Sequence, residues 1–335
     1  MSVVVKRNFG LFAAVVCLLF AGFIFSRIQS FWQPEKLPVV IAVSKTPLST
    51  PFYVAKSIDA FKNTCVDVEF HHVIGGQMAF TNVMSGQADF GTISDSVIAF
   101  QSLAQKKFVS HATFVHSDND VKLLSRPSAE IKTIADLRAR RVGVTKVTAS
   151  EYFLSSLLAM NGMSVADVDL VNYKPEQLLT AYLNNEVDAI VPWEPFAFKS
   201  IHLLGNEINL HDTKNLNSLS FNLISLPADN VTVNKAKCVI EGLAKAIDFI
   251  SSKPQAAQNI VINELGLEPD FIDWVWPDYI FKLSLNQSLL LSIKAQALWL
   301  AESQVSDHKQ LPQFNHFIDS RALLQVDSGA VTLSL

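Results

Sequence analysis

The amino-acid sequence alternates between short apolar runs and segments with helical periodicity, and this alternation constrains the fold more than any other feature. The run LPVVIAVS, Leu37–Ser44, predicts a buried strand. Thr50 then suits a helix N-cap, and Pro51 suits the first helical position. The same order continues through VDVEFHHV, a helix over about 77–84, ADFGTIS and a helix over about 95–103. Repeated strand–helix units predict a mainly parallel sheet covered on both faces.

Two distant segments share one pattern of elements. In VEFHHVIGGQMAFTNVMSGQADFGTISD and in VDLVNYKPEQLLTAYLNNEVDAIVPWE, a strand, a turn, an amphipathic helix and a short polar turn precede a second strand that starts at an aspartate. The chain has 335 residues, of which 49% are hydrophobic and 17% charged, and this is enough for about two globular units. The sequence therefore predicts an α/β protein with two similarly wound lobes.

Two strand-like runs that flank the second pattern predict the boundaries of the lobes. VKLLSRP leads out of the first lobe and LSFNLISLP leads back, and three helical segments come after the return, over about 234–250, 254–265 and 286–302. We expect the first lobe to comprise residues 38–124 and 219–335, and the second lobe residues 125–218. Two crossovers between the lobes, near Leu124 and Asn222, would form a hinge.

The N-terminal stretch from Asn8 to Ser26 carries no charge and comes after Lys6 and Arg7. As a helix with about 1.5 Å per residue it would be about 28 Å long, close to the roughly 30 Å of a bilayer's hydrocarbon core. We expect residues 1–30 to form a transmembrane anchor and residues 31–37 a linker; the alternative is a cleaved signal. Because positively charged flanks stay in the cytoplasm, the rest of the chain is expected on the other side of the membrane.

Composition and motifs argue against several function classes. Twenty-seven Lys and Arg residues against 31 Asp and Glu residues give a formal net charge of -4, so we expect no broad basic surface and no nucleic-acid partner. The sequence contains no CxxC, HExxH, GxSxG, GxGxxG or GxxxxGKS/T motif, and we expect no cofactor. Cys65 and Cys238 lie in the exported part, where a disulfide is permitted but is not established by the sequence.

Polar and aromatic residues come directly after the carboxyl ends of the predicted strands, where ligands collect in parallel α/β sheets. These residues are Ser44, Ser94, Asp95, Trp193 and Glu194, together with Thr148, Ala149 and Ser150 in the turn after RVGV. Thr148 can be a plain helix cap, or it can stand beside amides of Ala149 and Ser150 that hold an anion. Trp193 can be a core aromatic or a platform for a ligand.

Four segments carry a resemblance to a known family: GGQMAFTNVMSGQADFGTIS, IKTIADLRARRVGVTKVTASEYFL, VDAIVPWEPF and FIDSRALLQVDSGAVTL. In this order and spacing they resemble the ABC-transporter substrate-binding proteins of the nitrate, sulfonate, taurine and thiamine-pyrimidine-precursor class. The resemblance implies a type II periplasmic-binding fold and a monomer that binds a small solute and delivers it to an ABC permease with its ATPase. The resemblance places the protein in the periplasm. Family members usually have a cleavable signal or a lipid-modified cysteine, so the anchor predicted from the N-terminal stretch departs from the family. With this anchor the protein would be held on the periplasmic side of the inner membrane, and it would be soluble in the periplasm if the N-terminus is cleaved.

The carboxylates among the strand-end residues indicate what kind of solute to expect. Two carboxylates enclosed in a cleft need partners, so Asp95 and Glu194 are expected to hold an amine or multiple-donor part. The amides near Gly76 and Gln77, and those near Ala149 and Ser150, would meet an acidic part, while Trp193 packs on the body of the solute. The predicted contacts are completed by Ser44, Ser94, Thr148 and Asn222. Taurine-like zwitterions and aminopyrimidines fit this description, and nitrate does not.

Two other functions remain open from the sequence. An enzyme on the same fold would need a positioned nucleophile or metal ligands in the cleft, whereas Cys65 precedes a strand and His71 and His72 would point to opposite faces of one. A membrane-tethered solute sensor would need a separate signalling protein, because no catalytic or DNA-binding segment is attached. We therefore expect a binding protein and no catalytic residues.

Overall fold

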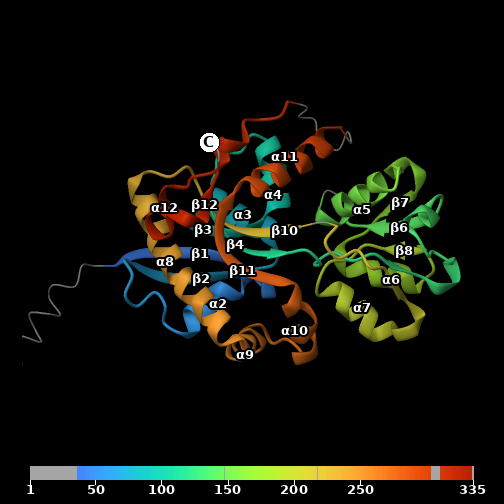
Figure 1. Ribbon diagram of the computed structural model, residues 1–335, viewed down its shortest axis with the longest axis horizontal. Helices are drawn as coiled ribbons and strands as arrows, with labels where there is room; N and C mark the ends of the chain where they lie inside the picture. Colours follow the sequence, from blue (N-terminus) through green and yellow to red (C-terminus); the bar gives the residue numbers. More distant parts are fainter. Residues whose placement is uncertain (1–35, 147, 217, 303–309, 334–335) are drawn as a thin grey trace, which may run out of the picture. The chain divides into compact units, whose positions relative to one another are not determined.

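The computed structural model describes residues 36–146, 148–216, 218–302 and 310–333. Within these ranges the chain forms a seven-stranded and a five-stranded β-sheet, each with helices on both faces (Figure 1). We refer to the seven-stranded sheet with its helices as the first lobe and to the five-stranded sheet with its helices as the second lobe. The α/β class expected from the sequence is confirmed.

The sheet of the first lobe has the strand order β12-β11-β4-β10-β3-β1-β2. Its strands are β1 (Leu37–Ser44), β2 (Val66–Val73), β3 (Phe90–Ser94), β4 (Val109–Ser117), β10 (Leu219–Ser225), β11 (Tyr279–Asn286) and β12 (Val331–Thr332). The expected parallel pairing holds for β1 and β3. The centre of the sheet is antiparallel instead, because β10 returns from the second lobe and enters the sheet between β3 and β4 in the opposite direction.

The helices of the first lobe form two groups. The first group packs together on one face and consists of α2 (Thr50–Ser57), α8 (Asn230–Ser252), α9 (Pro254–Leu265) and α12 (Arg321–Val326). The second group consists of α3 (Gly76–Met84), α4 (Asp95–Leu103) and α11 (Gln287–Glu302). Because both faces are covered, central strands such as β4 are buried almost throughout. The short helix α10 (Pro269–Val275) comes between α9 and β11.

The sheet of the second lobe has the strand order β7-β6-β8-β5-β9. Its strands are β5 (Leu124–Ser125), β6 (Arg141–Val144), β7 (Asp169–Asn172), β8 (Ala189–Ile190) and β9 (Asn209–Leu210), and its helices are α5 (Ala149–Met160), α6 (Leu178–Leu183) and α7 (Phe196–Leu204). One apolar core lies under α5 and contains Phe153, Leu154 and Leu157. A second core, on the α6 side, contains Leu178 and Tyr182. Strands β6, β7 and β8 are parallel, whereas β5 is antiparallel to β8.

Two crossovers connect the sheets: residues 118–123 between β4 and β5, and residues 211–218 between β9 and β10. The first crossover is held against the second lobe, since Lys122 N donates to Pro192 O at 2.9 Å and Glu194 N donates to Asp120 O at 3.0 Å. The lobe boundary predicted at 124/125 falls inside β5. Asn222, expected near the second crossover, lies within β10.

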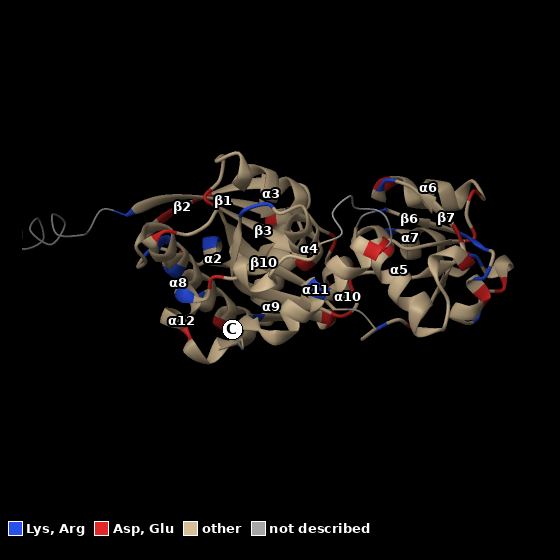
Figure 2. Ribbon diagram, turned by 90° about the horizontal axis from the view of Figure 1, so that it is seen from above, with Lys and Arg blue, Asp and Glu red and all other residues tan. Residues whose placement is uncertain are grey.

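A disulfide joins Cys65, just before β2, to Cys238 in α8, with a Cα–Cα distance of 5.7 Å. Both cysteines belong to the first lobe, so the disulfide connects its two separate stretches of chain. In the view of Figure 2, Lys and Arg positions are scattered among Asp and Glu positions. The anchor predicted over Asn8–Ser26 lies outside the described residues. Among the helices that are described, none has the length and apolar character needed to cross a bilayer.

Candidate functional site

Three predicted site residues of the first lobe meet at the carboxyl ends of β1 and β3. Ser44 N donates to Thr92 Oγ1 at 2.9 Å, and Ser44 Oγ donates to Thr92 O at 3.2 Å, so the end of β1 is fixed beside β3. Gly76 opens α3 at the same place, because a Cβ on it would lie 3.2 Å from Ile93 Cα and 3.3 Å from Ser94 N. Glycine therefore allows the start of α3 to approach the end of β3.

The first turn of α3 places Gln77 at the surface. Its Oε1 accepts a hydrogen bond from Gln101 Nε2 of α4 at 3.1 Å. Ser94, half-buried at the end of β3, caps α4 by accepting from Val97 N at 3.3 Å. Gln77 and Ser94 keep surface that a solute can reach, whereas Ser44 is fully buried.

Asp95, the first residue of α4, is 2% exposed and has its donors within the chain. Its Oδ2 accepts from Ser292 Oγ at 2.8 Å and from Gln296 Nε2 at 3.1 Å, both in α11. Its Oδ1 accepts from Ser96 N at 3.0 Å and from Ser220 N at 3.5 Å. Burial raises the pKa of Asp95 to about 6 although these donors oppose the shift. A bound solute is not required to satisfy this carboxylate.

The turn after β6 supplies the predicted residues of the second lobe. Thr148 acts as a helix cap, because its Oγ1 accepts from Ser150 N at 3.2 Å. The Ser150 amide is therefore occupied, and Ser150 Oγ donates to Val191 O at 2.6 Å, which fixes the start of α5 beside the end of β8. Thr148 and Ala149 are half-buried, and Ser150 is buried.

Trp193 and Glu194 come after β8 and precede a cis bond to Pro195. Trp193 is half-buried: its ring packs against the core under α5, and its backbone pairs with Val121 of the first crossover. The position of Trp193 is therefore compatible with a core aromatic and with a platform for a ligand. Glu194 is 5% exposed, and its Oε2 accepts from Phe198 N of α7 at 2.9 Å.

The other carboxylate oxygen of Glu194, Oε1, contacts residues of the first lobe and of the first crossover. Trp274 of α10 donates its indole Nε1–H to Glu194 Oε1 at 2.7 Å, and Lys122 Nζ lies 3.8 Å from the same oxygen. Asp95 and Glu194 thus have entirely different partners, and the chain itself supplies the donors that were expected from a solute. Asn222 is also satisfied, since Thr113 Oγ1 donates to its Oδ1 at 2.6 Å and its Nδ2 lies 3.2 Å from Ser220 Oγ.

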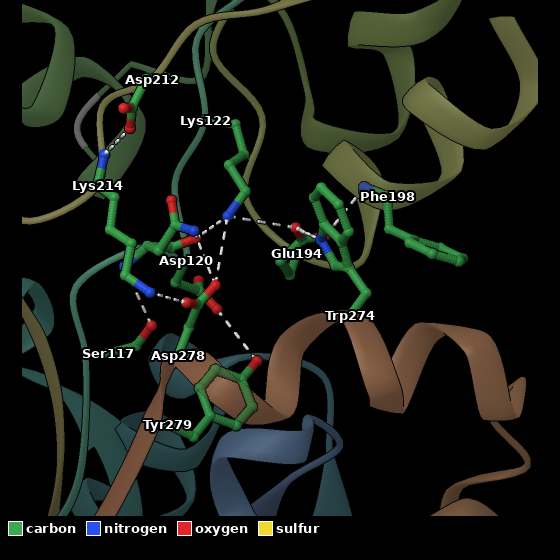
Figure 3. Close-up of polar contacts among 11 residues, drawn as sticks. Ser117, Asp120, Lys122, Glu194, Phe198, Asp212, Lys214, Trp274, Asp278 and Tyr279 are labelled. Carbon is green, nitrogen blue, oxygen red and sulfur yellow. Dashed lines mark hydrogen bonds and ion pairs between the residues drawn. The ribbon is translucent and has the colours of Figure 1, made fainter. Parts of the chain in front are cut away.

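A polar cluster around Glu194 was not foreseen from the sequence. We call it the interlobe cluster, and it consists of Asp120, Lys122, Glu194, Trp274, Asp278 and Tyr279 (Figure 3). Lys122 is 2% exposed, donates to Asn119 O, and lies 4.0 Å from Asp278 Oδ2. Tyr279 donates its hydroxyl to Asp120 Oδ1 at 3.4 Å. The signal in the sequence was WVWPDY, Trp274–Tyr279, in which aromatic residues, a proline and an acid stand together as they do in PWEPF.

Burial governs the protonation of the interlobe cluster. It raises the pKa of Asp120 to about 7, assisted by the charge of Glu194 and opposed by that of Lys122. It also raises the pKa of Glu194 and lowers that of Lys122. The charges of three carboxyl groups, those of Glu194, Asp278 and Asp120, therefore act on the one buried ammonium group of Lys122, and the raised pKa of Asp120 lies near neutral pH.

Several buried hydroxyl groups in the described part of the chain lack hydrogen-bond partners, and those of Ser49 and Thr145 are considered for the site. Ser49 precedes α2, and its Oγ makes no capping bond. Thr145 comes directly after β6, and its Oγ1 is likewise unsatisfied. A buried polar atom without a partner is unfavourable by roughly 1–3 kcal/mol, so each hydroxyl would gain from an added hydrogen-bonding group. One lies in each lobe, after a strand whose end was expected to contribute to the site.

A cavity of about 470 Å³ lies elsewhere in the first lobe, lined among others by Lys106, Lys107, Phe108 and His316. None of the predicted ligand residues lines it. A ligand in this cavity would contact only one lobe, so the strand ends remain the candidate site. Within the described ranges, no group of three or more His, Cys, Asp or Glu side chains is placed to hold a metal ion. Cys65 is in a disulfide and therefore offers no free thiolate.

Comparisons with known proteins find relatives of this chain by sequence and by fold. The model of a family described as NMT1/THI5 like matches residues 46–257. A putative aliphatic sulfonates-binding protein of Escherichia coli K12 is 27% identical over 183 residues, which cover 54% of this chain and 57% of that protein. The taurine-binding periplasmic protein of the same organism is 23% identical over 170 residues, covering 49% and 50%. The chain spans about half the length of the curated relatives it matches.

Solved structures extend the likeness over most of the chain. The crystal structure of the periplasmic aliphatic sulphonate binding protein SsuA from Escherichia coli superposes with a TM-score of 0.72 at 18% identity, covering 85% of this chain and 98% of that one. The α/β fold of periplasmic binding proteins is therefore confirmed, as is the resemblance found in the sequence. The proteins named are binding proteins.

Proposed function

Because the chain belongs to the NMT1/THI5-like family, we propose that it binds a small polar organic solute between its two lobes, on the periplasmic side of the inner membrane. The relatives named for aliphatic sulfonates and for taurine support a sulfonate or amino-sulfonate, with a pyrimidine-like solute as the further candidate. Delivery to an ABC permease with its ATPase, and anchoring through residues 1–30, belong to the same proposal.

The predicted site residues that keep accessible surface are the proposed ligand contacts. Among the predicted positions, those that keep accessible surface are Gly76, Gln77, Ser94, Thr148, Ala149 and Trp193. The buried positions are Ser44, Asp95, Ser150, Glu194 and Asn222, and their polar groups are engaged with other parts of the chain. In the proposal these buried residues hold the strand ends in place and do not touch the solute.

The start of α5 is the proposed site for the sulfonate group. A helix N-terminus carries partial positive charge, and a strong anion is stabilised there. Lys146, the exposed second residue after β6, adds a full positive charge close in sequence to this helix start. The buried Thr145 hydroxyl, which lacks a partner, offers one further hydrogen bond. This unsatisfied hydroxyl beside a helix N-terminus is the observation that carries the proposal.

The rest of the solute would lie against Trp193 and the start of α3. An indole face attracts an ammonium group and also packs on an alkyl chain or a flat ring. In this proposal the indole of Trp193 holds the amine of an amino-sulfonate or an aminopyrimidine, in place of the carboxylates of Asp95 and Glu194. Gln77, at the first turn of α3, supplies both a donor and an acceptor for polar substituents.

Calorimetric titration tests this function with taurine, an alkanesulfonate, an aminopyrimidine and nitrate as separate probes. We expect at least one organic probe to bind, and Trp193→Ala and Gln77→Ala each to weaken its binding about tenfold or more. Gln87→Ala is the matched control, because Gln87 is exposed just beyond the far end of the same helix. The proposal is wrong if no organic probe binds, or if both site variants keep full affinity.

A further inference from the structure

Helix α10 belongs to the first lobe but makes its polar contact with the second. Along the chain it lies between α9, which packs on α2, and β11, which pairs with β4. Its Trp274 donates to Glu194 of the second lobe at 2.7 Å. The ring of Phe198, in the first turn of α7, lies 5.2 Å from that of Phe271 and 6.2 Å from that of Trp274.

The residues between α10 and β11 contact both crossovers. Asp278 Oδ2 accepts from Asn119 Nδ2 of the first crossover at 2.7 Å, and Asp278 Oδ1 pairs with Lys214 Nζ of the second crossover at 2.7 Å. One carboxylate therefore connects the two segments that must bend when the lobes move. Figure 3 shows Asp278 between Lys122 and Lys214, with Trp274 directed toward Glu194.

We propose that the interlobe cluster holds the two lobes together in the absence of ligand, with Trp274 as the positioning residue that must leave Glu194 when the lobes open. This inference rests on the proposed function only in that a solute enters through such an opening. A contact made in one state and lost in the other changes the balance between the two states by its own free energy. Trp274 therefore sets how often the binding site opens without touching the solute.

The burial of Glu194 explains why its hydrogen bond with Trp274 stabilises only the arrangement in which the lobes are in contact. At 5% exposure, its Oε1 has no solvent to replace the indole donor unless the lobes separate. Opening admits water to this oxygen, whereas loss of the indole donor in the closed arrangement leaves the buried Oε1 with only Lys122 Nζ at 3.8 Å. The Trp274 hydrogen bond thus stabilises the arrangement in which the lobes are in contact.

Hydrogen exchange of the full-length, ligand-free protein tests the proposal. Trp274→Phe keeps an aromatic ring beside Phe198 and removes the N–H donor. We expect exchange in the first crossover and at the start of α7, residues 118–123 and 194–198, to become about tenfold faster or more. Trp276→Phe is the matched control, since Trp276 packs on Phe281 within the first lobe, with ring centroids 5.2 Å apart. This control should leave the same peptides unchanged.

A second variant covers the possibility that Trp274→Phe does not fold. Glu194→Gln keeps the size of the side chain but offers only one acceptor to the Trp274 and Phe198 donors, so the same peptides should again exchange faster. Unchanged exchange in both variants, or a uniform increase over the whole chain, would overturn the inference. Because no solute is added, the exchange result does not depend on the proposed function. It remains valid if no ligand is found, and the discovery of a ligand would not support the inference if exchange is unchanged.

Discussion

Lys214 Nζ and Asp278 Oδ1 lie 2.7 Å apart and connect the second crossover to the residues between α10 and β11. The Lys214 side chain is 44% exposed and that of Asp278 only 11%. The two ends of the ion pair therefore have unequal effects on the molecule. If Lys214 is removed, solvent can take its place beside Asp278. If Asp278 is removed, Asn119 and Lys122 also lose their contacts with its carboxylate.

Lys214→Met is accordingly expected to lower the free energy of unfolding by less than about 1 kcal/mol. Asp278→Ala should lower it by about 1–3 kcal/mol, because the half-buried Asn119 amide loses its acceptor and the buried Lys122 ammonium loses one of its two ion-pair partners. Urea denaturation of both variants measures the difference. Equal effects would show that Asp278 acts on Lys214 alone.

Asp120 predicts how stability depends on pH. Burial, with Glu194 nearby, raises its pKa from 3.8 to about 7, so the folded state keeps a proton that the unfolded state releases between these values. The free energy of unfolding therefore falls as pH rises through this window, and the loss is complete above pH 7. Asp120→Asn removes this titration and should gain stability relative to the parent as pH increases. The pKa of Asp95 is also raised, but Asp95 is present in both the parent and the Asp120→Asn variant. The difference between their free energies of unfolding therefore reports on Asp120.

Urea denaturation at several pH values between about 4 and 8 measures this difference. A constant offset between Asp120→Asn and the parent, with no dependence on pH, would count against the assignment.

The disulfide predicts a large loss of stability on its removal. Cys65 and Cys238 are separated by 173 positions, so their bond restricts a very long loop in the unfolded chain. Replacing both by Ser should lower the free energy of unfolding by about 2–5 kcal/mol. The third cysteine of the chain, Cys17, lies outside the described residues, and Cys17→Ser is the control for the replacement of a cysteine by serine. If a reducing agent destabilises the double variant as much as the parent, the bond is not the cause.

Asp95 distinguishes a structural carboxylate from a ligand contact. Asp95→Asn leaves a single acceptor oxygen for the donors of Ser292, Gln296, Ser96 and Ser220. At about pH 8, above its pKa of about 6, we expect a loss of about 1–3 kcal/mol in the free energy of unfolding. Asp67→Asn, at an exposed position in β2, is the control for the change of charge. An Asp95 variant as stable as the parent would return this residue to the list of ligand contacts.

Local sequence signals predicted several elements with their observed bounds. The strand Leu37–Ser44, the helix Asp95–Leu103 and the helix Pro254–Leu265 are each set by a run or a period that lies within the element itself. The predicted α3 and α11 differ from the observed helices by one residue at their starts. Where the signal is local and repeats over several turns, the chain folds as the pattern predicts.

The segment that forms α10 and β11 was missed for a physical reason. The helix has only seven residues, Pro269–Val275, too few for a helical period to stand out, and Pro277 interrupts the pattern directly after it. The same limit affected the site. The strand-end rule correctly selected Ser44, Ser94 and Glu194 as neighbours of strand ends, but the side-chain donors from α10 and α11 that engage Asp95 and Glu194 come from positions 80 or more residues away. Such pairs depend on the assembled fold and leave no trace in local periodicity.

The place of β10 between β3 and β4 has a consequence for the order in which the protein is made. At the ribosome, β3 and β4 emerge before the entire second lobe, yet they cannot be bridged until residues 219–225 have emerged. The second lobe is continuous in sequence and can fold as soon as it emerges, whereas the first must keep two apolar strands unpaired with each other throughout that interval. A nascent chain that pauses before Leu219 therefore exposes unpaired edges of β3 and β4, and unpaired strand edges are prone to aggregation.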